Sequence, residues 1–582
     1  MVRQYIGARY VTKFYENSQD PSSAEWESNV NYEPLVLVTY NNGSYLSKKE
    51  VPANVGNPAT NPSYWVQTGF YNGQIADLQN QITALISAIA ETYVTPEKYG
   101  AAGDGVTDDT DAFRTALTAN TILVLNEDST YLISGTITIP SGTKIYGNGA
   151  TIKIADNSAL TNGVFYADNV NDIFINDIVF DSNVSNQAAL SISDPLYNIP
   201  VKLFQSSNII VDNCKFTGLY TASIQVQQCD GNIELTNNVV NMGSSSFGFD
   251  GIAFHCIGNA STINLKIDHN YFTCNVLDFD HGYSAVMVGD TKGHTVISNN
   301  YIKKCGRSDA YSQPCSAVEL YINVANCVIT NNEFDDCYLI SRIMNSHDII
   351  VSENSINETT PHTPISGMIT IFNGIYYGVP EDTYNIKVLN NSFNMVSTSL
   401  SFAMIQLSSQ SNDVAPHDIS IIGNHFKCAA AINIYNGSRT IKIENNIMDS
   451  SVSGSFILIY NTQDSNVTPG GLFVSHNKVN IPSGCPLNCA GLIKAASAFS
   501  YIVDNDFTFG TPISMHLPSL IQGNHLTLIG GDPSDPQAFV YYTALQAANY
   551  CYLFDNITGA ALYKPTGAQI IANRNYHDGT AY

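Results

Sequence analysis

Ile267-Asp268-His269-Asn270-Tyr271-Phe272 is one copy of a short phrase that recurs along most of this 582-residue chain. Each copy has an asparagine with an apolar residue three positions before it. Another apolar residue stands two positions after the asparagine in every copy but one, which has Thr558 at that position. The asparagines are Asn238, Asn270, Asn300, Asn332, Asn354, Asn391, Asn424, Asn446, Asn477, Asn505, Asn524 and Asn556. Successive positions differ by 19 (524 − 505) to 37 (391 − 354) residues, a spacing typical of stacked repeats, so the phrase predicts a solenoid.

The segments between the asparagines indicate which kind of solenoid this is. They are short and rich in β-branched residues, as in Cys327-Val328-Ile329-Thr330, and the long Ala, Leu, Glu and Lys runs of helical repeats are absent. Asparagine tolerates the left-handed backbone of a tight turn, and stacked amides can hydrogen-bond along the stack. We therefore predict an asparagine ladder inside a parallel β-helix. Ordinary hairpin loops are the alternative, but the flanking apolar residues are too regular for them.

Composition narrows the range of partners. The chain has 25 Lys and Arg against 50 Asp and Glu, a formal charge of −25, which argues against nucleic acid and acidic lipid surfaces. Only 13% of residues are charged, so a surface of Asn, Ser, Thr, Gly and Tyr suits neutral, hydroxyl-rich ligands. The twelve cysteines lack zinc-type spacing and are expected to be buried free thiols, although Cys485 and Cys489 are close enough for a loop disulfide. We predict no metal and no cofactor.

The beginning of the sequence carries no export signal. Met1 to Tyr5 lacks an apolar secretion region, and no stretch of about 18 apolar residues is present to span a membrane. We expect no signal peptide and no membrane insertion, with release by lysis or carriage on a particle.

Residues 1–70 form a separate module by composition, because both tryptophans, Trp26 and Trp65, lie there. Between them runs a strand pattern from Tyr32 to Tyr40. Over residues 20–69 the pattern resembles the small chitin-binding-type β modules found at the start of phage tail fibres. The tryptophans either stack on sugar or fill a miniature core, and we favour a core and an attachment role because so small a module needs its large aromatics for stability.

Residues 71–92 carry a heptad seam, which predicts a coiled-coil stem between chains. The seam residues are Ile75, Leu78, Ile82, Leu85 and Ile89. A solitary amphipathic helix is the alternative, and barely three heptads do not fix the number of strands in the coil.

The stretch from Tyr99 to Phe113, which reads Tyr-Gly-Ala-Ala-Gly-Asp-Gly-Val-Thr-Asp-Asp-Thr-Asp-Ala-Phe, closely resembles the opening motif of the pectate-lyase-like superfamily, shared by polygalacturonases and phage tailspikes. The resemblance implies an all-β fold, a right-handed parallel β-helix, over residues 93–582. The glycines permit a tight turn, and Thr107 or Asp108 is expected to cap a helix over residues 107–119. The apolar face of that helix would cover the open end of the first coil.

Outward side chains of neighbouring coils lie about 4.8 Å apart, which suits the two carboxyl groups that glycoside hydrolysis requires. Alternation in the strands before the asparagine phrases points one set of polar side chains outward. Together with turn residues beside these strands, the candidates are Gln225, Asp250, His255, Asp278, Asp280, His281, Glu319 and Tyr321.

We assign these residues roles in a predicted site. Asp250 or Asp280 pairs with Glu319 as acid and base, while His255 or His281 tunes them and Tyr321 stacks on a sugar. Gln225 and Asp278 complete the substrate-binding set. The alternative is that Asp and His at turns only satisfy backbone groups.

The expected chemistry is hydrolysis. The polygalacturonase catalytic pattern is not intact here, so the resemblance implies the fold but no catalytic triad. A lyase needs a base plus a cation against a uronate carboxylate, and from Gln205 to Asn300 the only Lys or Arg residues are Lys215, Lys266 and Lys292.

These features together predict a phage tailspike or tail-fibre depolymerase, carried on the virion, that binds and cleaves a bacterial surface polysaccharide. The N-terminal module would attach to a phage tail or baseplate protein. Similar tailspikes are trimers, so the resemblance implies a homotrimer. The rivals are a non-catalytic glycan-binding adhesin, a polysaccharide lyase, and a secreted plant-polysaccharide hydrolase, which the stem and the absent signal argue against.

Overall fold

The computed structural model divides the chain into two compact units, Met1–Tyr93 and Val94–Tyr582. The residues that the structure describes are 13–20, 23–41, 43–69, 81–82, 92–187, 197–219, 221–242, 251–274, 283–306, 316–360, 367–376, 379–380, 382–396, 403–409, 415–429, 431–435, 438–450, 459–462, 471–480, 493–495, 500–509, 513–515, 519–528, 540–541, 550–558, 569–577 and 580–581.

The first unit is a small sheet with an aromatic core. Its strands, in sheet order, are β1 (Lys13–Phe14), β2 (Val36–Tyr40), β3 (Gly43–Ser47) and β4 (Trp65–Gly69). Trp65 is 2% exposed and packs edge to face on Tyr32 at 5.2 Å between ring centroids. Trp26 is half-buried and packs edge to face on Tyr40. Trp65 therefore fills the core and is not a sugar platform.

The predicted coiled-coil stem lies almost entirely outside the described residues. Residues 81, 82 and 92 are in helical conformation, and the side chain of Ile82, one of the seam residues, is 48% exposed. The stem remains a prediction.

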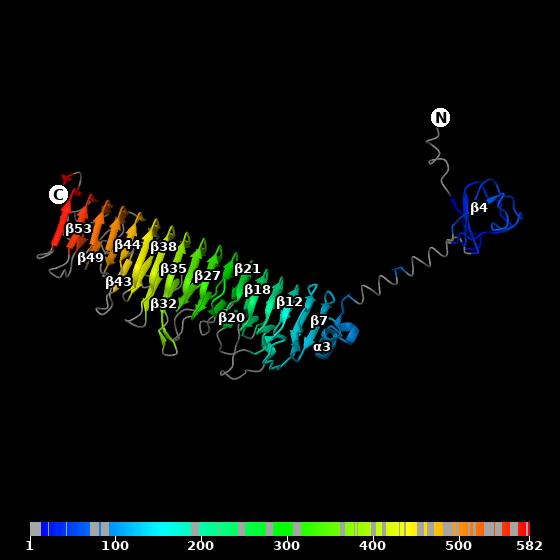
Figure 1. Ribbon diagram of the computed structural model, residues 1–582, viewed down its shortest axis with the longest axis horizontal. Coiled ribbons are helices and arrows are strands. Elements are labelled where there is room, and N and C mark those ends of the chain that lie inside the picture. Colours follow the sequence, from blue (N-terminus) through cyan, green and yellow to red (C-terminus); the bar gives the residue numbers. More distant parts are fainter. Residues whose placement is uncertain are drawn as a thin grey trace, which may run out of the picture. The chain divides into compact units, whose positions relative to one another are not determined.

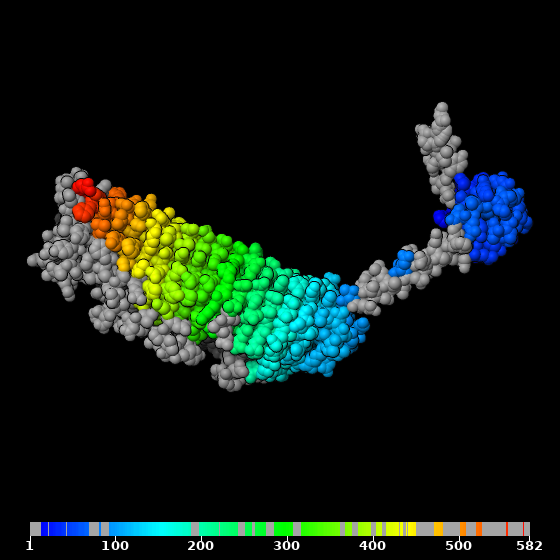
Figure 2. Space-filling model, in the orientation of Figure 1, coloured from blue at the N-terminus to red at the C-terminus, as the bar shows by residue number. Residues whose placement is uncertain are grey.

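The second unit is a parallel β-helix, so the predicted fold class is confirmed. Each coil contributes strands to three parallel sheets in turn, and Figure 1 shows the coils following one another in sequence order from β7 to β53. In the space-filling view they continue without interruption along the unit (Figure 2).

We name the sheets I, II and III in the order in which the chain enters them after each asparagine turn. Sheet I contains β5 (Asp104–Asp108), β7 (Thr130–Ile133), β10 (Thr151–Ile154), β13 (Val179–Asp181), β16 (Lys215–Thr217), β19 (Val239–Met242), β22 (Tyr271–Cys274), β25 (Tyr301–Lys303), β28 (Glu333–Asp335), β31 (Ser355–Asn357), β36 (Ser392–Asn394), β39 (His425–Cys428), β42 (Ile447–Ser450), β45 (Lys478–Asn480), β48 (Asp506–Phe509), β51 (His525–Leu528), β54 (Ile557–Thr558), β56 (Tyr576–His577) and the antiparallel β57 (Thr580–Ala581).

Sheet II carries the strands on which the site was predicted. It contains β8 (Ile137–Thr138), β11 (Phe165–Asp168), β14 (Val201–Phe204), β17 (Ile224–Gln227), β20 (Gly251–Ser261), β23 (Tyr283–Thr291), β26 (Val318–Tyr321), β29 (Ser341–Met344), β32 (Ile369–Asn373), β37 (Ile405–Ser409), β40 (Ile432–Tyr435), β43 (Ile459–Thr462), β46 (Ile493–Ala495), β49 (Ile513–Met515) and β52 (Val540–Tyr541). A two-stranded hairpin, β33 (Ile375–Tyr376) and β34 (Val379–Pro380), follows β32.

Sheet III leads into the asparagine turns. It contains β6 (Ile122–Val124), β9 (Lys144–Tyr146), β12 (Asn171–Asn176), β15 (Ser207–Asp212), β18 (Asp230–Thr236), β21 (Asn264–Asp268), β24 (Thr295–Ser298), β27 (Ala325–Thr330), β30 (His347–Ser352), β35 (Tyr384–Leu389), β38 (His417–Ile422), β41 (Arg439–Glu444), β44 (Leu472–Ser475), β47 (Ser500–Val503), β50 (Ser519–Gln522), β53 (Tyr550–Phe554) and β55 (Gln569–Asn573).

The turn from sheet III to sheet I holds the predicted asparagine ladder. The backbone N–H and Nδ2 of Asn300 both donate to Oδ1 of Asn332, at 3.0 and 2.9 Å, and Nδ2 also donates to the Ile267 carbonyl. The same pattern repeats from Asn238 to Asn556, and all the ladder side chains are buried. The stacked amides thus satisfy both themselves and the turn backbone.

One detail of the prediction is corrected. The left-handed residue is the one before each ladder asparagine, such as Asn331 at φ 54° and Glu353 at φ 56°, because the ladder amide must point inward instead. The ladder also continues beyond Asn556, because Oδ1 of Asn575 accepts from the N–H and Nδ2 of Asn556.

The opening motif forms the N-terminal cap of the β-helix. Gly103 and Gly105 have φ of 61° and 73°, the left-handed region that glycine adopts without strain. The expected helix over 107–119 begins later, as α3 (Thr110–Ala119), because residues 104–108 form β5. Asp109 directly precedes the helix, but its carboxylate accepts from the N–H of Ala102 at 2.7 Å. The carboxylate of Asp108, one of the two predicted capping residues, accepts from the N–H of Thr110 at 3.0 Å. The apolar face of α3 is buried against the first coil, as predicted.

Two 3₁₀ turns are also described, η1 (Pro96–Tyr99) and η2 (Val184–Asn186). None of the helices described is long and apolar enough to cross a membrane.

Eight cysteines that the structure describes are buried free thiols, as the sequence predicts: Cys214, Cys229, Cys256, Cys274, Cys305, Cys327, Cys337 and Cys428. Burial raises the pKa of Cys229 to about 11 and that of Cys214 to about 12, which makes both thiols inert packing groups at neutral pH. Cys485 and Cys489 lie outside the described residues.

Candidate functional site

The outer face of sheet II carries a row of side chains in register across seven coils. We call this the sheet II row; it consists of Gln225, His255, Met287, Glu319, Arg342, Thr370 and Gln406. The alternation places their neighbours, such as Phe254 and Val318, fully inside. Three predicted site residues, Gln225, His255 and Glu319, therefore lie on one row, as expected.

Tyr321, the other predicted site residue that the structure describes, lies off this row. Tyr321 is half-buried on the adjacent row, in register with Gly289 and Met344. The alternation is interrupted at the start of β20, where Ile252 is half-buried and both Ala253 and Phe254 are fully buried.

Four predicted residues, Asp250, Asp278, Asp280 and His281, lie outside the described residues. The pairing of Glu319 with Asp250 or Asp280 therefore remains a prediction.

Gln225 and His255 form a polar pair at one end of the row. Nε2 of Gln225 lies 3.4 Å from Nδ1 of His255, and Gln225 is 1% exposed. Oε1 of Gln225 has no hydrogen-bond partner among the described residues. Burial lowers the pKa of His255 to about 4, so the imidazole is neutral at neutral pH. A neutral, half-buried imidazole is suited to accept a proton or a sugar hydroxyl.

Because burial lowers the pKa of His255, we expect the free energy of unfolding to fall in acid. The unfolded chain binds a proton at this histidine near pH 6.5, whereas the folded chain does so only near pH 4. Its contribution is therefore fully present above pH 6.5 and falls by up to roughly 1.4 kcal/mol per pH unit as the pH drops toward 4. Urea unfolding between pH 7 and 4 of the full chain and of a His255→Gln variant measures this. We expect a shallower loss in the variant, and equal slopes would contradict the assignment.

Glu319 and Arg342 form an ion pair in the middle of the row. Oε1 of Glu319 lies 3.5 Å from Nη1 of Arg342, and the two side chains are only 11% and 17% exposed. The guanidinium also lies over the ring of Phe372, with 5.9 Å from Cζ to the ring centroid, and Nη2 donates to Sδ of Met344. These contacts hold the cation in place and compensate a carboxylate that is largely removed from water.

Arg342 is the residue that the sequence reasoning missed. The basic residues that the sequence places near the predicted site run only to Asn300, and four strands, β25 to β28, lie between Asn300 and β29. Part of the signal was present, because the alternation in Ser341-Arg342-Ile343-Met344 buries Ile343 and sends Arg342 outward. Its place beside Glu319 follows only from the pairing of β26 with β29.

The row combines a carboxylate, a guanidinium and a neutral imidazole on one rigid face. His255 and Glu319 are two strand spacings apart, with Met287 between them, which corresponds to roughly 10 Å along the helix axis. Within the described part of the chain, no cluster of three or more His, Cys, Asp or Glu residues is arranged to hold a metal.

The first part of the β-helix matches a known family model. Residues 94–308 match the family model described as rhamnogalacturonase A/epimerase, pectate lyase-like, so the resemblance to the pectate-lyase-like superfamily is confirmed over this stretch.

Particular relatives are phage appendage proteins. The pre-neck appendage protein of Bacillus phage phi29 is 26% identical over 265 residues, covering 40% of this chain and 29% of the relative. Depolymerase 1 of Klebsiella phage K5-2, capsule K30/K69-specific, is 24% identical over 296 residues, covering 48% of this chain and 35% of the relative. The chain thus spans about a third or less of the length of these two relatives.

Among solved structures, a mutant tailspike protein of E. coli bacteriophage HK620 in complex with a pentasaccharide aligns with 78% of this chain and 79% of its own. The identity is 12% and the TM-score is 0.48.

Proposed function

We propose that this chain is a phage tailspike that binds and depolymerises a bacterial surface polysaccharide on the outer face of sheet II. The observation that carries the proposal is the sheet II row, where Glu319, Arg342 and His255 share one rigid face. The phage appendage relatives, one of them a capsule depolymerase, support it.

The reaction we propose is glycoside hydrolysis. Glu319 acts with Asp250 or Asp280, one carboxyl protonating the leaving oxygen and the other activating water or attacking the sugar. The ion pair with Arg342 favours the ionised form of Glu319 and hence the base or nucleophile role, leaving the acid role to the aspartate. Gln225, Asp278, His281 and Tyr321 bind the sugar around them.

A polysaccharide lyase is the second candidate, and Arg342 is the observation that favours it. In β-elimination a base removes the proton α to a uronate carboxylate while a cation neutralises the developing charge. The guanidinium of Arg342 is a cation of the required type on the sheet II row, and Glu319 beside it is the nearest candidate base. A purely adhesive protein would use the same face without either reaction.

The place of action that we propose is the virion. The N-terminal unit attaches to a tail or baseplate protein, and the stem over residues 71–92 joins chains into a homotrimer. Light scattering of the full chain tests the assembly: a mass of three chains supports it, and a monomer contradicts it.

Product chemistry tests the reaction. The full chain is incubated with purified bacterial capsular and O-antigen polysaccharides, and the products are assayed for new reducing ends and for ultraviolet absorbance of an unsaturated sugar. Shortened chains with reducing ends and no absorbance support hydrolysis. Absorbance identifies a lyase, and binding without shortening identifies an adhesin.

A further inference from the structure

Two hollows lie on the outer face of sheet III, away from the sheet II row. The first, of about 350 Å³, is lined by Lys144, Asp172, Ile173, Phe174, Asn208, Ile209, Ile210, Asn232 and Glu234. The second, of about 240 Å³, is lined by His294, Asn326, Val328, Asp348, Ile350, Asn385 and Lys387. The first falls at the lower end of the volumes typical of ligand pockets. Both hollows are built from the same two rows of sheet III.

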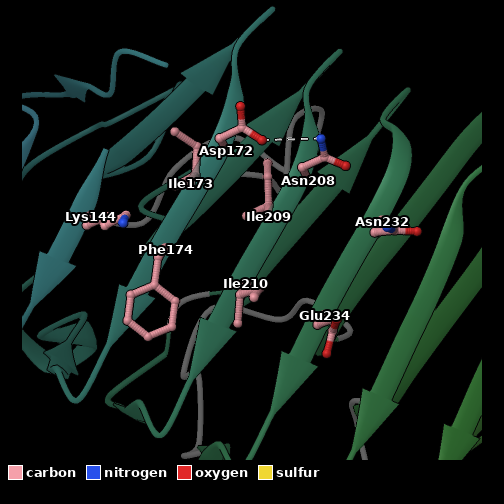
Figure 3. A pocket seen from close by; sticks show the side chains of 9 residues that line it. All are labelled: Lys144, Asp172, Ile173, Phe174, Asn208, Ile209, Ile210, Asn232 and Glu234. Atoms are coloured by element: carbon pink, nitrogen blue, oxygen red, sulfur yellow. Dashed lines mark hydrogen bonds between the residues drawn. The ribbon is translucent and has the colours of Figure 1, made fainter. Parts of the chain in front are cut away.

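The floor of each hollow is an outward apolar pair on neighbouring strands. Phe174 and Ile210 are in register on β12 and β15, and Figure 3 shows them side by side. Ile210 is 36% exposed. In the second hollow Val328 and Ile350 hold the equivalent places on β27 and β30. Apolar side chains that face outward from a half-solvated sheet offer a surface for the apolar face of a ring.

The rim of each hollow is an oriented amide beside a carboxylate. Nδ2 of Asn208 donates to Oδ1 of Asp172 at 3.2 Å, and in Figure 3 its amide oxygen points away from that bond. Nδ2 of Asn385 donates to Oδ1 of Asp348 in the same arrangement. All four residues have left-handed backbone, with φ between 52° and 61°, which favours Asn and Asp over other side chains.

The charges of both hollows are compensated locally. In the first hollow Glu234 pairs with Lys266 at 3.7 Å and Lys144 offsets Asp172, and in the second hollow Lys387 offsets Asp348. Such a rim offers hydrogen bonds without a net charge to attract an ion. Its chemistry therefore suits a neutral, hydroxyl-rich ligand.

We infer that the outer face of sheet III is a second, non-catalytic glycan-binding groove that holds neutral segments of a polysaccharide chain at the two hollows. The inference rests on the proposed function only for the class of ligand, because the hollows lie on sheet III and share no residue with the sheet II row.

The spacing of the hollows suits a linear polymer. Their central strands, β15 and β30, are separated by five strand spacings through β18, β21, β24 and β27, which amounts to roughly 24 Å along the axis. Two weak subsites on one rigid scaffold raise the effective concentration of the chain at both without any new contact.

The test uses the full chain carrying Glu319→Gln, so that the probe is not cut, and a panel of purified bacterial capsular and O-antigen polysaccharides. Ile210→Asp introduces a charge into the floor of the first hollow. We expect it to weaken binding of the recognised polysaccharide by about tenfold, since it removes an apolar contact and adds an unpaired charge. The matched control is Ile447→Asp, an apolar side chain on sheet I that is 44% exposed and is expected to leave the affinity unchanged.

The outcomes separate the two proposals. Equal affinity of the Ile210→Asp and Ile447→Asp chains, or a panel in which nothing binds, overturns the groove. A fall in the mass of the assembly caused by Ile210→Asp alone, seen by light scattering, also overturns it and identifies the face as a contact between copies of the chain. A polysaccharide that requires Ile210 for binding but is never shortened by the unmodified chain supports the groove and overturns the depolymerase.

Discussion

Replacing Asn332 by alanine is expected to lower the free energy of unfolding by about 3 to 5 kcal/mol. Oδ1 of Asn332 accepts from both the backbone N–H and Nδ2 of Asn300, and its own Nδ2 donates to the Ile297 carbonyl and to Oδ1 of Asn354. All these groups are buried, so alanine leaves donors and acceptors unpaired where water does not reach. Equilibrium urea unfolding followed by circular dichroism measures the loss.

The matched control is the residue immediately before it. Asn331 is exposed and has a φ of 54°, so Asn331→Gly is expected to change the stability by less than about 0.5 kcal/mol. A loss in Asn332→Ala no larger than in this control would show that the ladder does not hold the coils together.

Replacing Glu319 by glutamine is expected to slow polysaccharide cleavage by about 10² to 10⁴-fold, the range in which acid and base groups contribute. Glutamine keeps the size and the hydrogen-bonding reach of the side chain beside Arg342 but neither gains nor loses a proton. Binding of the intact polymer should therefore survive while turnover falls. The rate is measured as reducing ends released per chain per unit time.

Glu333→Gln is the control for this experiment, because Glu333 is an exposed carboxylate on β28 of sheet I. It should cleave at the unmodified rate. A Glu319→Gln chain that keeps full activity would remove Glu319 from the site, whatever the behaviour of the aspartates.

The fold was predictable from sequence because its main determinant is local and repeated. The apolar residues that flank Asn270, Ile267 and Phe272, are fully buried, and the amide between them finds its partner one coil away. What the repeat did not indicate is which residue of the turn takes the strained backbone. Asparagine is itself suited to a left-handed backbone, and only the inward direction of the ladder amide places that backbone at the preceding residue instead.

The site was predictable only in part, for a physical reason. Alternation places Gln225, His255 and Glu319 on one face, because the side-chain period of a strand is two residues. It does not give the register between strands of different length, and so it did not bring Arg342 beside Glu319. The hollows on sheet III were missed for the same reason, since Phe174 and Ile210 meet only through pairing of β12 with β15.

The most direct test of the central claim is a crystal structure of the Glu319→Gln chain soaked with the oligosaccharides that the unmodified chain releases from its polysaccharide. We expect sugar density on the outer face of sheet II, with a ring within hydrogen-bond distance of residue 319 and of Arg342. Sugar bound elsewhere on the chain, with the sheet II row empty, would contradict the account.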